Sequence, residues 1–160
     1  MSIFLTVISG VFIFVIGQAI LKLIIEPVQE VKKTLAKIQI DQFLLGHIAH
    51  NSETFDQNDL DKVFNAYREY SGTLIAHTTL IPFYKNIAKI TGLPSKDKMI
   101  EASRNLVKLS NWINSSSDVK LGHIMRNTQG LVDNLGLYLS QADRVSDDLI
   151  QELMTPKRRD

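Results

Sequence analysis

The sequence predicts an all-α fold, with one N-terminal transmembrane helix followed by a bundle of about five helices. Two observations support this. None of the 35 charged residues (18 Lys and Arg, 17 Asp and Glu) falls within residues 1–21, where 15 residues are apolar. In the remainder, apolar residues recur at spacings of three and four, which is typical of one face of a helix. No segment alternates apolar and polar residues for long, so no β-sheet is expected.

Residues 3–21 form the expected transmembrane helix. Five of these 19 residues are not apolar, and a helix of this length spans about 28 Å, close to the ~30 Å hydrocarbon core of a bilayer. A cleaved signal peptide is the alternative, but such peptides have basic residues before a shorter apolar run. We therefore expect an uncleaved anchor over residues 1–25, with the lipid bilayer as a partner.

Basic residues lie on one side of this helix. Lys22, Lys32, Lys33 and Lys37 follow it, and no Lys or Arg precedes it. The positive-inside rule then predicts an N-terminus outside and residues 22–160 in the cytoplasm, with the anchor in the bacterial inner membrane. The absence of cysteine fits a reducing compartment.

Three small residues share one face of the predicted anchor. Thr6, Gly10 and Gly17 lie close together on a helical wheel. Small residues let two transmembrane helices approach closely, which predicts a membrane-helix interface in a homo-oligomer. The alternative is that these glycines have no such role, since glycine is common in transmembrane helices.

The junction between anchor and bundle consists of Lys22, Glu26 and Pro27. Lys22 can extend its ammonium group to the membrane surface. Pro27 can either begin a new helix or kink a continuous one. The helix that follows has an apolar row with one polar interruption at Gln42: Val28, Val31, Leu35, Ile38, Gln42, Leu45 and Ala49.

The next predicted helix follows a polar loop at residues 51–57. Asn58 is its expected N-cap, and Asp59 and Asp61 lie in the first turn, where the helix dipole favours anions. Pro82 ends the helix. The expected buried face comprises Leu60, Val63, Phe64, Tyr67, Leu74 and Ile81.

A short helix and a longer one come next. The short helix covers residues 83–91 and is closed by Gly92. Ser95 is the expected N-cap of the longer helix, which a loop at residues 115–118 follows. The expected buried row of the longer helix is Met99, Ser103, Leu106, Ser110 and Ile113.

The longest apolar pattern predicts one C-terminal amphipathic helix, of bundle or coiled-coil type, over residues 121–153. Gly122, Gly130 and Gly136 weaken this helix and can bend or divide it. The bundle then extends over residues 26–154, and a basic tail over residues 155–160 includes Lys157, Arg158 and Arg159. The apolar row consists of Leu121, Met125, Thr128, Val132, Leu135, Leu139, Ala142, Ser146, Leu149 and Leu153.

His47 and His50 are weak candidates for a metal site. They are three residues apart on one helix face, where imidazoles can bind zinc, but a further ligand such as His77 is needed. The alternative is two partly exposed histidines near a helix end. No cofactor or small-molecule substrate is predicted, and the sequence lacks phosphate-binding glycine loops, nucleophile elbows and metalloprotease motifs. A net charge of +1 argues against nucleic acid as a partner.

Residues 14–30 (FVIGQAILKLIIEPVQE) are similar to the start of a group of small, uncharacterised bacterial inner-membrane proteins. Shorter matches are residues 46–50 (GHIAH), 81–84 (IPFY), 101–103 (EAS) and 109–111 (LSN). The resemblance extends over residues 10–113. It implies a single membrane span with a helical cytoplasmic domain, and it supplies no activity.

The anchor, Pro27 and the first apolar row also resemble the first helix of HAMP signalling domains. In those domains a Gly-Asp turn and a second helix follow, whereas here residues 39–45 continue the first helix. The sequence as a whole favours a membrane-anchored interaction or scaffold protein without enzyme activity, binding a partner protein or copies of itself. The alternatives are a membrane-perturbing effector of defence or toxin type and a HAMP-like signal relay.

Overall fold

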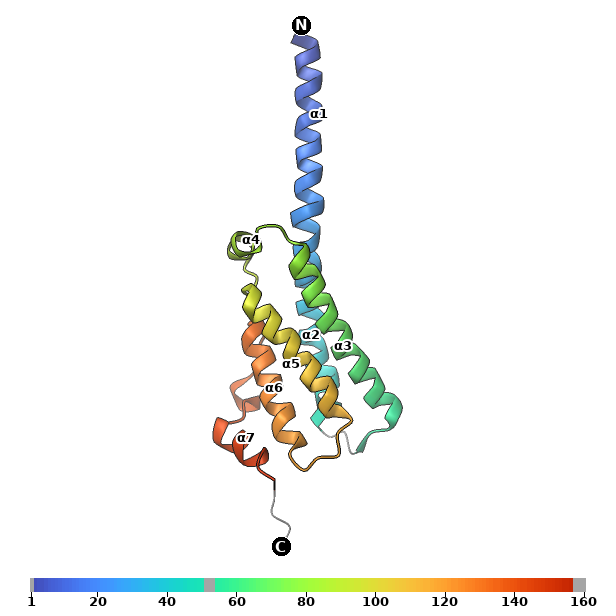
Figure 1. The fold of residues 1–160 in the computed structure, drawn as a ribbon, viewed down its shortest axis with the longest axis vertical. Helices are drawn as coiled ribbons and strands as arrows, with labels where there is room; N and C mark the ends of the chain where they lie inside the picture. The colour runs from blue at the N-terminus through green and yellow to red at the C-terminus, as the bar shows by residue number, and fades with distance from the viewer. Residues whose placement is uncertain (1, 51–53, 157–160) are drawn as a thin grey trace.

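The computed structural model describes residues 2–50 and 54–156, and within these ranges every regular element is a helix. Figure 1 shows a long rod whose lower part packs into a bundle; the rod consists of α1 (Ser2–Ile20), η1 (Leu21–Ile25) and α2 (Glu26–His50). The predicted all-α fold is confirmed. The other helices are α3 (Gln57–Leu80), α4 (Tyr84–Thr91), α5 (Lys96–Ile113), α6 (Lys120–Leu135), η3 (Gln141–Asp143) and α7 (Asp147–Leu153).

The rod is continuous, and it widens to a π-turn at η1 just before Pro27. Proline has no N–H, and its ring would clash with the carbonyl of Leu23 in a regular α-helix. In the π-turn the Glu26 N–H donates to the carbonyl of Leu21, so the hydrogen-bond register shifts by one residue ahead of the proline. Of the two predicted roles of Pro27, the structure shows a proline within a continuous helix.

The apolar side chains of α1 project into open space on every side. The helix is long and apolar enough to span a membrane, and none of that apolar stretch is buried within the protein. Large exposed apolar surfaces on proteins mark contacts with membranes or other proteins. The structure therefore supports the prediction of one candidate membrane-spanning helix near the N-terminus.

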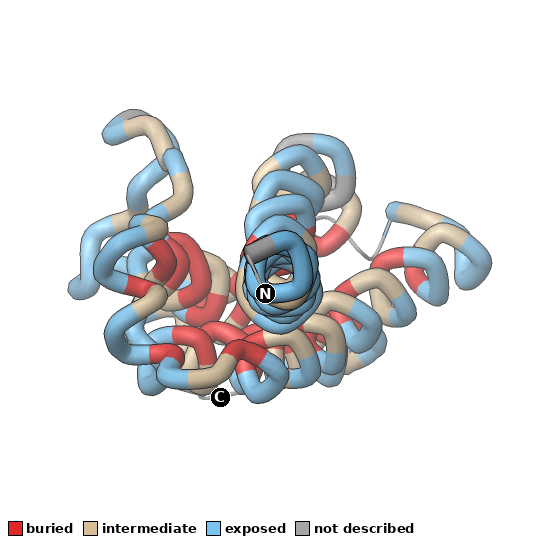
Figure 2. Tube along the Cα trace, turned by 90° about the horizontal axis from the view of Figure 1, so that it is seen from above, coloured by how far each residue is buried: buried red, intermediate tan, exposed pale blue. Residues whose placement is uncertain are grey.

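Four helices, α2, α3, α5 and α6, form the bundle. α3 packs along α5, α5 packs along α6, and α2 covers α3. Seen from the end of the anchor, the buried segments meet where these helices face one another (Figure 2). A buried hydrogen bond of 2.8 Å joins the hydroxyls of Ser71 and Ser103 where α3 meets α5. The side chains with almost no exposure include Val31, Ile38, Val63, Tyr67, Leu74, Met99, Leu106, Leu109, Ile113, Ile124 and Leu131.

The predicted helix ends in the middle of the chain are confirmed, with one correction. Gly92 closes α4 in the left-handed conformation, and the Ser95 hydroxyl accepts a hydrogen bond from the Lys98 N–H at the start of α5. The prediction of Asn58 as the N-cap of α3 is wrong. Asp56 caps this helix, because its carboxylate accepts a 2.8 Å hydrogen bond from the Asp59 N–H, and the helix begins at Gln57.

The predicted single helix over residues 121–153 is also wrong. α6 ends at Leu135, and Gly136 takes the left-handed conformation with φ +65°. Glycine adopts this conformation without steric cost, so it ends the helix at the position that follows the last turn. The chain then runs through an irregular segment and η3 before Ser146 caps α7.

This division changes which C-terminal residues are buried. In α6 the buried positions include Ile124, Leu131 and Leu135, whereas Ser146 and Leu149 in the predicted apolar row are exposed. α7 folds back against α6. The row from Leu121 to Leu153 therefore offers no continuous surface for self-association. Residues 157–160, which include the basic side chains of the predicted tail, lie outside the described residues.

Candidate functional site

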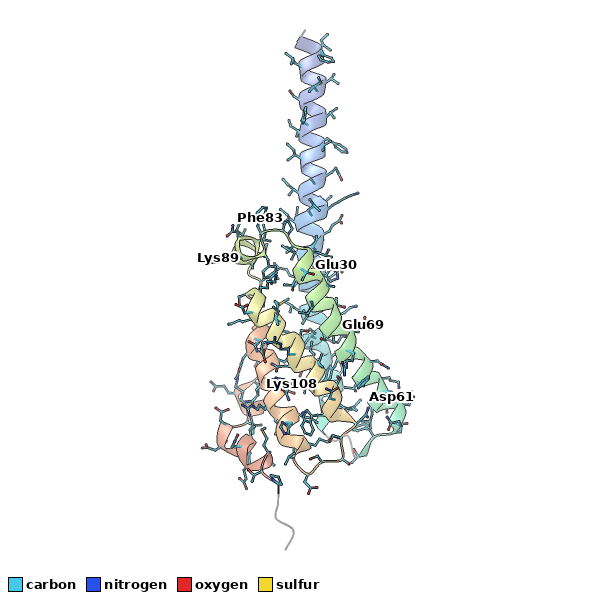
Figure 3. The ribbon with its side chains drawn as sticks, viewed as in Figure 1. Glu30, Asp61, Glu69, Phe83, Lys89 and Lys108 are labelled. Carbon is cyan, nitrogen blue, oxygen red and sulfur yellow. The ribbon has the colours of Figure 1, made fainter. Side chains whose placement is uncertain are left out.

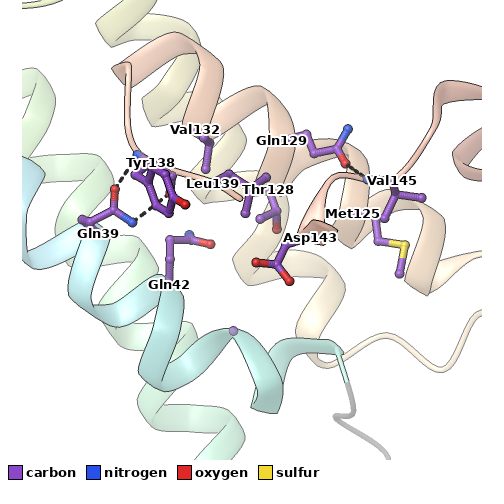
Figure 4. Close-up of a pocket in the computed structure, with 11 residues that line it drawn as sticks. Gln39, Gln42, Met125, Thr128, Gln129, Val132, Tyr138, Leu139, Asp143 and Val145 are labelled. Carbon is purple, nitrogen blue, oxygen red and sulfur yellow. Dashed lines mark hydrogen bonds between the residues drawn. The ribbon is translucent and has the colours of Figure 1, made fainter. Parts of the chain in front are cut away.

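The bundle is least closed along one side, between α2 and α6. α2 packs on α3 and α6 packs on α5, while α2 and α6 touch each other at few points. A groove of about 330 Å³ lies in this gap, and the irregular segment after α6 forms its outer wall (Figure 4). Ligand sites in helical bundles form between facing helices, so this groove is the leading candidate site.

The groove is mainly apolar and contains a few polar groups. Its described apolar lining comes from α6 and the segment after it: Met125, Val132, Leu139 and Val145. The polar lining includes Gln42 from α2, Thr128 from α6 and Asp143 from η3. Figure 4 shows the Gln42 side chain reaching from α2 toward the groove.

Gln42 has a buried amide nitrogen without a hydrogen-bond partner among the described residues. A buried polar group left in this state costs about 1–3 kcal/mol. An acceptor that enters the groove, such as a peptide carbonyl, would recover part of this free energy. Gln42 is thus the side chain that most directly suggests a bound partner.

Two glutamines hold the outer wall of the groove in place. The Gln39 amide accepts a 2.7 Å hydrogen bond from the Tyr138 N–H and donates a 3.1 Å hydrogen bond to the Tyr138 carbonyl. At the other end of the wall, Gln129 accepts a 2.6 Å hydrogen bond from the Val145 N–H. An ion pair of 2.6 Å between Arg144 and Asp133 lies beside it. These contacts attach both ends of the outer wall to the bundle.

The structure does not test the two weak candidates for a metal site, His47 and His50. The side chains of His47 and His50 lie outside the described residues, and the described part of the chain has no cluster of three metal-ligating side chains. The hydrogen bond from Lys33 lowers the pKa of the Glu30 carboxyl below its usual value, and nearby His77 adds a smaller effect in the same direction. The α2 backbone carries His47 about 25 Å beyond Glu30, so His77 is not brought to the other two histidines.

The predicted membrane residues lie apart from the groove. Thr6, Gly10 and Gly17 are on exposed surface of α1, and the space around both glycines is open. Lys22 and Glu26 are exposed at the junction, and Pro27 is half-buried there. The apolar helix α1 and the groove are thus separate features of one rod-and-bundle structure.

Sequence reasoning did not identify the groove. Its local sign was the polar residue Gln42 within an otherwise apolar row, whereas Gln39 and Tyr138 are 99 residues apart and carry no shared pattern. Comparisons with known proteins add no assignment, because no protein-family model, curated protein or solved structure matches the chain.

Proposed function

We propose that this chain is a membrane-anchored interaction protein of the bacterial inner membrane, and that the groove between α2 and α6 binds an apolar segment of another polypeptide. α1 would hold the protein in the bilayer, with the bundle in the cytoplasm. The four lysines after the apolar stretch support this orientation. The occupant of the groove is a partner protein or a second copy of the chain.

The unpaired amide of Gln42 is the observation that most favours this function. A polypeptide segment offers apolar side chains for the lining and a backbone carbonyl for the Gln42 N–H. Catalysis offers a weaker account of the groove, because its described lining contains one carboxylate, Asp143, and no histidine. An active site generally needs a paired acid and base or nucleophile.

Site-specific photo-cross-linking in cells tests the proposal. A photoreactive residue replaces Asp143, which is exposed at the groove, or Glu69, which is exposed on α3 and serves as the matched control. We expect a discrete adduct from position 143 and none from position 69. The mass of the adduct then distinguishes a partner protein from a second copy.

A groove-filling variant makes this test specific. Thr128→Phe adds a ring to the groove wall, and it is expected to abolish the adduct from position 143 while the bundle keeps its melting temperature. The absence of any adduct, or an adduct that persists in Thr128→Phe, would contradict the proposal. If expression of the parent chain and of Thr128→Phe depolarises cells equally, the result would instead favour the alternative of a membrane-perturbing effector.

A further inference from the structure

A short helix lies at the end of the bundle from which the anchor emerges. In Figure 1, α4 is at the height of the junction and is seen end-on, whereas α1 runs vertically, so α4 lies across the direction of α1. A helix that lies across a membrane-spanning helix at this height runs along the membrane surface. Amphipathic helices bind membranes in this orientation.

Three large apolar side chains at this end face solvent. Leu80, Phe83 and Ile90, which we call the α4 patch, are 62%, 82% and 83% exposed. The opposite side of α4 is fixed to the bundle, because Tyr84 and Ala88 are buried and the Tyr84 hydroxyl donates a 2.8 Å hydrogen bond to the carbonyl of Pro94. One face of α4 thus packs on the bundle, and the other face is exposed to solvent.

Phe83 adopts an unusual backbone conformation that supports this exposure. Its φ is +50°, and it is the only non-glycine residue with positive φ among those that the structure describes. Bulky residues rarely occupy this region because of steric strain. The turn separates α3 from α4, and Figure 3 shows Phe83 on the side of α4 that faces the anchor. Strained residues of this kind tend to occur where function requires them.

The charge of α4 suits an anionic lipid surface. Lys85 and Lys89 are exposed on α4, which contains no acidic residue, and Lys22 is exposed at the junction. Apolar and aromatic side chains beside lysines characterise helices that bind the headgroup region. Each lysine close to an anionic bilayer adds to the attraction.

We propose that the α4 patch, with Lys85 and Lys89, binds the anionic surface of the bilayer that α1 crosses. This proposal rests on the membrane anchoring of α1. The second contact would stop the bundle from rotating freely about the rod, and the groove would then keep a fixed direction relative to the membrane.

Fluorescence quenching in vesicles tests this contact. The chain has no cysteine, so a single introduced cysteine can carry an environment-sensitive fluorophore such as NBD. The full chain is labelled at Ile90→Cys, at Ile16→Cys within α1, or at Lys108→Cys on α5. Each protein is reconstituted in phosphatidylcholine–phosphatidylglycerol vesicles that contain lipids with a quencher high on the acyl chain.

We expect quenching at positions 16 and 90 and none at position 108. Lys85→Glu combined with Lys89→Glu should reduce the quenching at position 90 several-fold and leave position 16 unchanged. Quenching at position 16 without quenching at position 90 would overturn the lipid contact of α4 and leave the membrane insertion of α1 supported. The absence of quenching at position 16 would contradict the membrane insertion of α1 itself. A blue-shifted but unquenched label at position 90 would assign the α4 patch to a protein contact and also overturn the proposal.

Discussion

The imidazole of His123 in α6 stacks on the ring of Trp112 in α5, where the two helices pack together. The ring centroids are 4.0 Å apart and the planes differ by 7°. Partial burial, followed by the charge of Arg126, lowers the pKa of the imidazole below its ordinary value of 6.5. The folded chain therefore binds this proton less readily than the unfolded chain. The resulting contribution to stability is complete above pH 6.5 and is lost as the pH falls through the folded-state pKa.

We therefore expect acidification through this range to lower the free energy of unfolding. His123→Phe keeps an aromatic ring but cannot bind a proton, so it should remove this part of the decrease. Urea titrations of the detergent-solubilised chain at several pH values measure the effect, with the fluorescence of the single tryptophan, Trp112, as the signal. Equal pH slopes in the two proteins would contradict the prediction.

Local roles were predictable for some single residues, whereas the N-cap of α3 was predicted at Asn58 and lies at Asp56. Gly92 and Ser95 end and begin helices through contacts within a few residues, and both predictions are confirmed. The paired hydrogen bonds of Gln39 with Tyr138 and of Ser71 with Ser103 join different helices or segments. Such pairs depend on how the elements pack, which the local pattern does not determine.

At the level of elements, the contact of α7 with α6 depends on Gly122. A Cβ at this position would lie 2.7 Å from Met154 Cγ and 2.8 Å from the backbone carbon of Leu153. Gly122→Ala is expected to displace α7 and to lower the free energy of unfolding by about 1–3 kcal/mol, the usual cost of overpacking. Chemical denaturation measures this change, and limited proteolysis should show earlier cleavage near α7.

Gly72→Ala is the matched control for this substitution. Gly72 lies within α3, and nothing surrounds the position that its Cβ would take. Alanine is favoured over glycine within a helix by about 0.5–1 kcal/mol, so this variant should be slightly more stable than the parent chain. If both variants change stability in the same direction, close packing of α7 on Gly122 is not the determining factor.

The C-terminal pattern shows why periodicity alone misplaced a helix. Spacings of three and four continue past Gly136, and Leu139 in this row is half-buried, whereas Ser146 and Leu149 are exposed. Leu139 and Val145 reach the groove from irregular backbone that Gln39 and Gln129 hold by hydrogen bonds. The pattern therefore predicted neither the backbone conformation of this segment nor the burial of every residue in the row.

At the level of the whole molecule, the sequence predicted an all-α fold with one long apolar N-terminal helix, but not the groove. The long apolar helix α1 and the buried rows of α2, α3 and α5 follow from local composition and spacing, and the structure agrees with them. The groove forms because α2 packs on α3 and α6 packs on α5 without closing on each other. That outcome depends on relative helix placement, for which Gln42 was the single local indication.

We expect any self-association through α1 to use its small-residue face. The row over residues 121–153 is divided, so the face with Thr6, Gly10 and Gly17 is the remaining predicted contact between copies. Apolar side chains gain little from leaving lipid for another helix, and close backbone approach at small residues is what favours association. Both glycines are exposed with open space around them, as such an approach requires.

Gly10→Leu combined with Gly17→Leu should therefore reduce dimerisation several-fold. Energy transfer between donor- and acceptor-labelled chains in vesicles, at a fixed protein-to-lipid ratio, measures the dimer fraction. Ala19→Leu is the control, because it adds an apolar side chain on the opposite face of the helix at about 100° per residue. Equal transfer in the glycine variant and the Ala19 variant would show that this face does not mediate association. In that case the anchor would act as a monomeric tether, and any pairing of copies would have to occur through the groove.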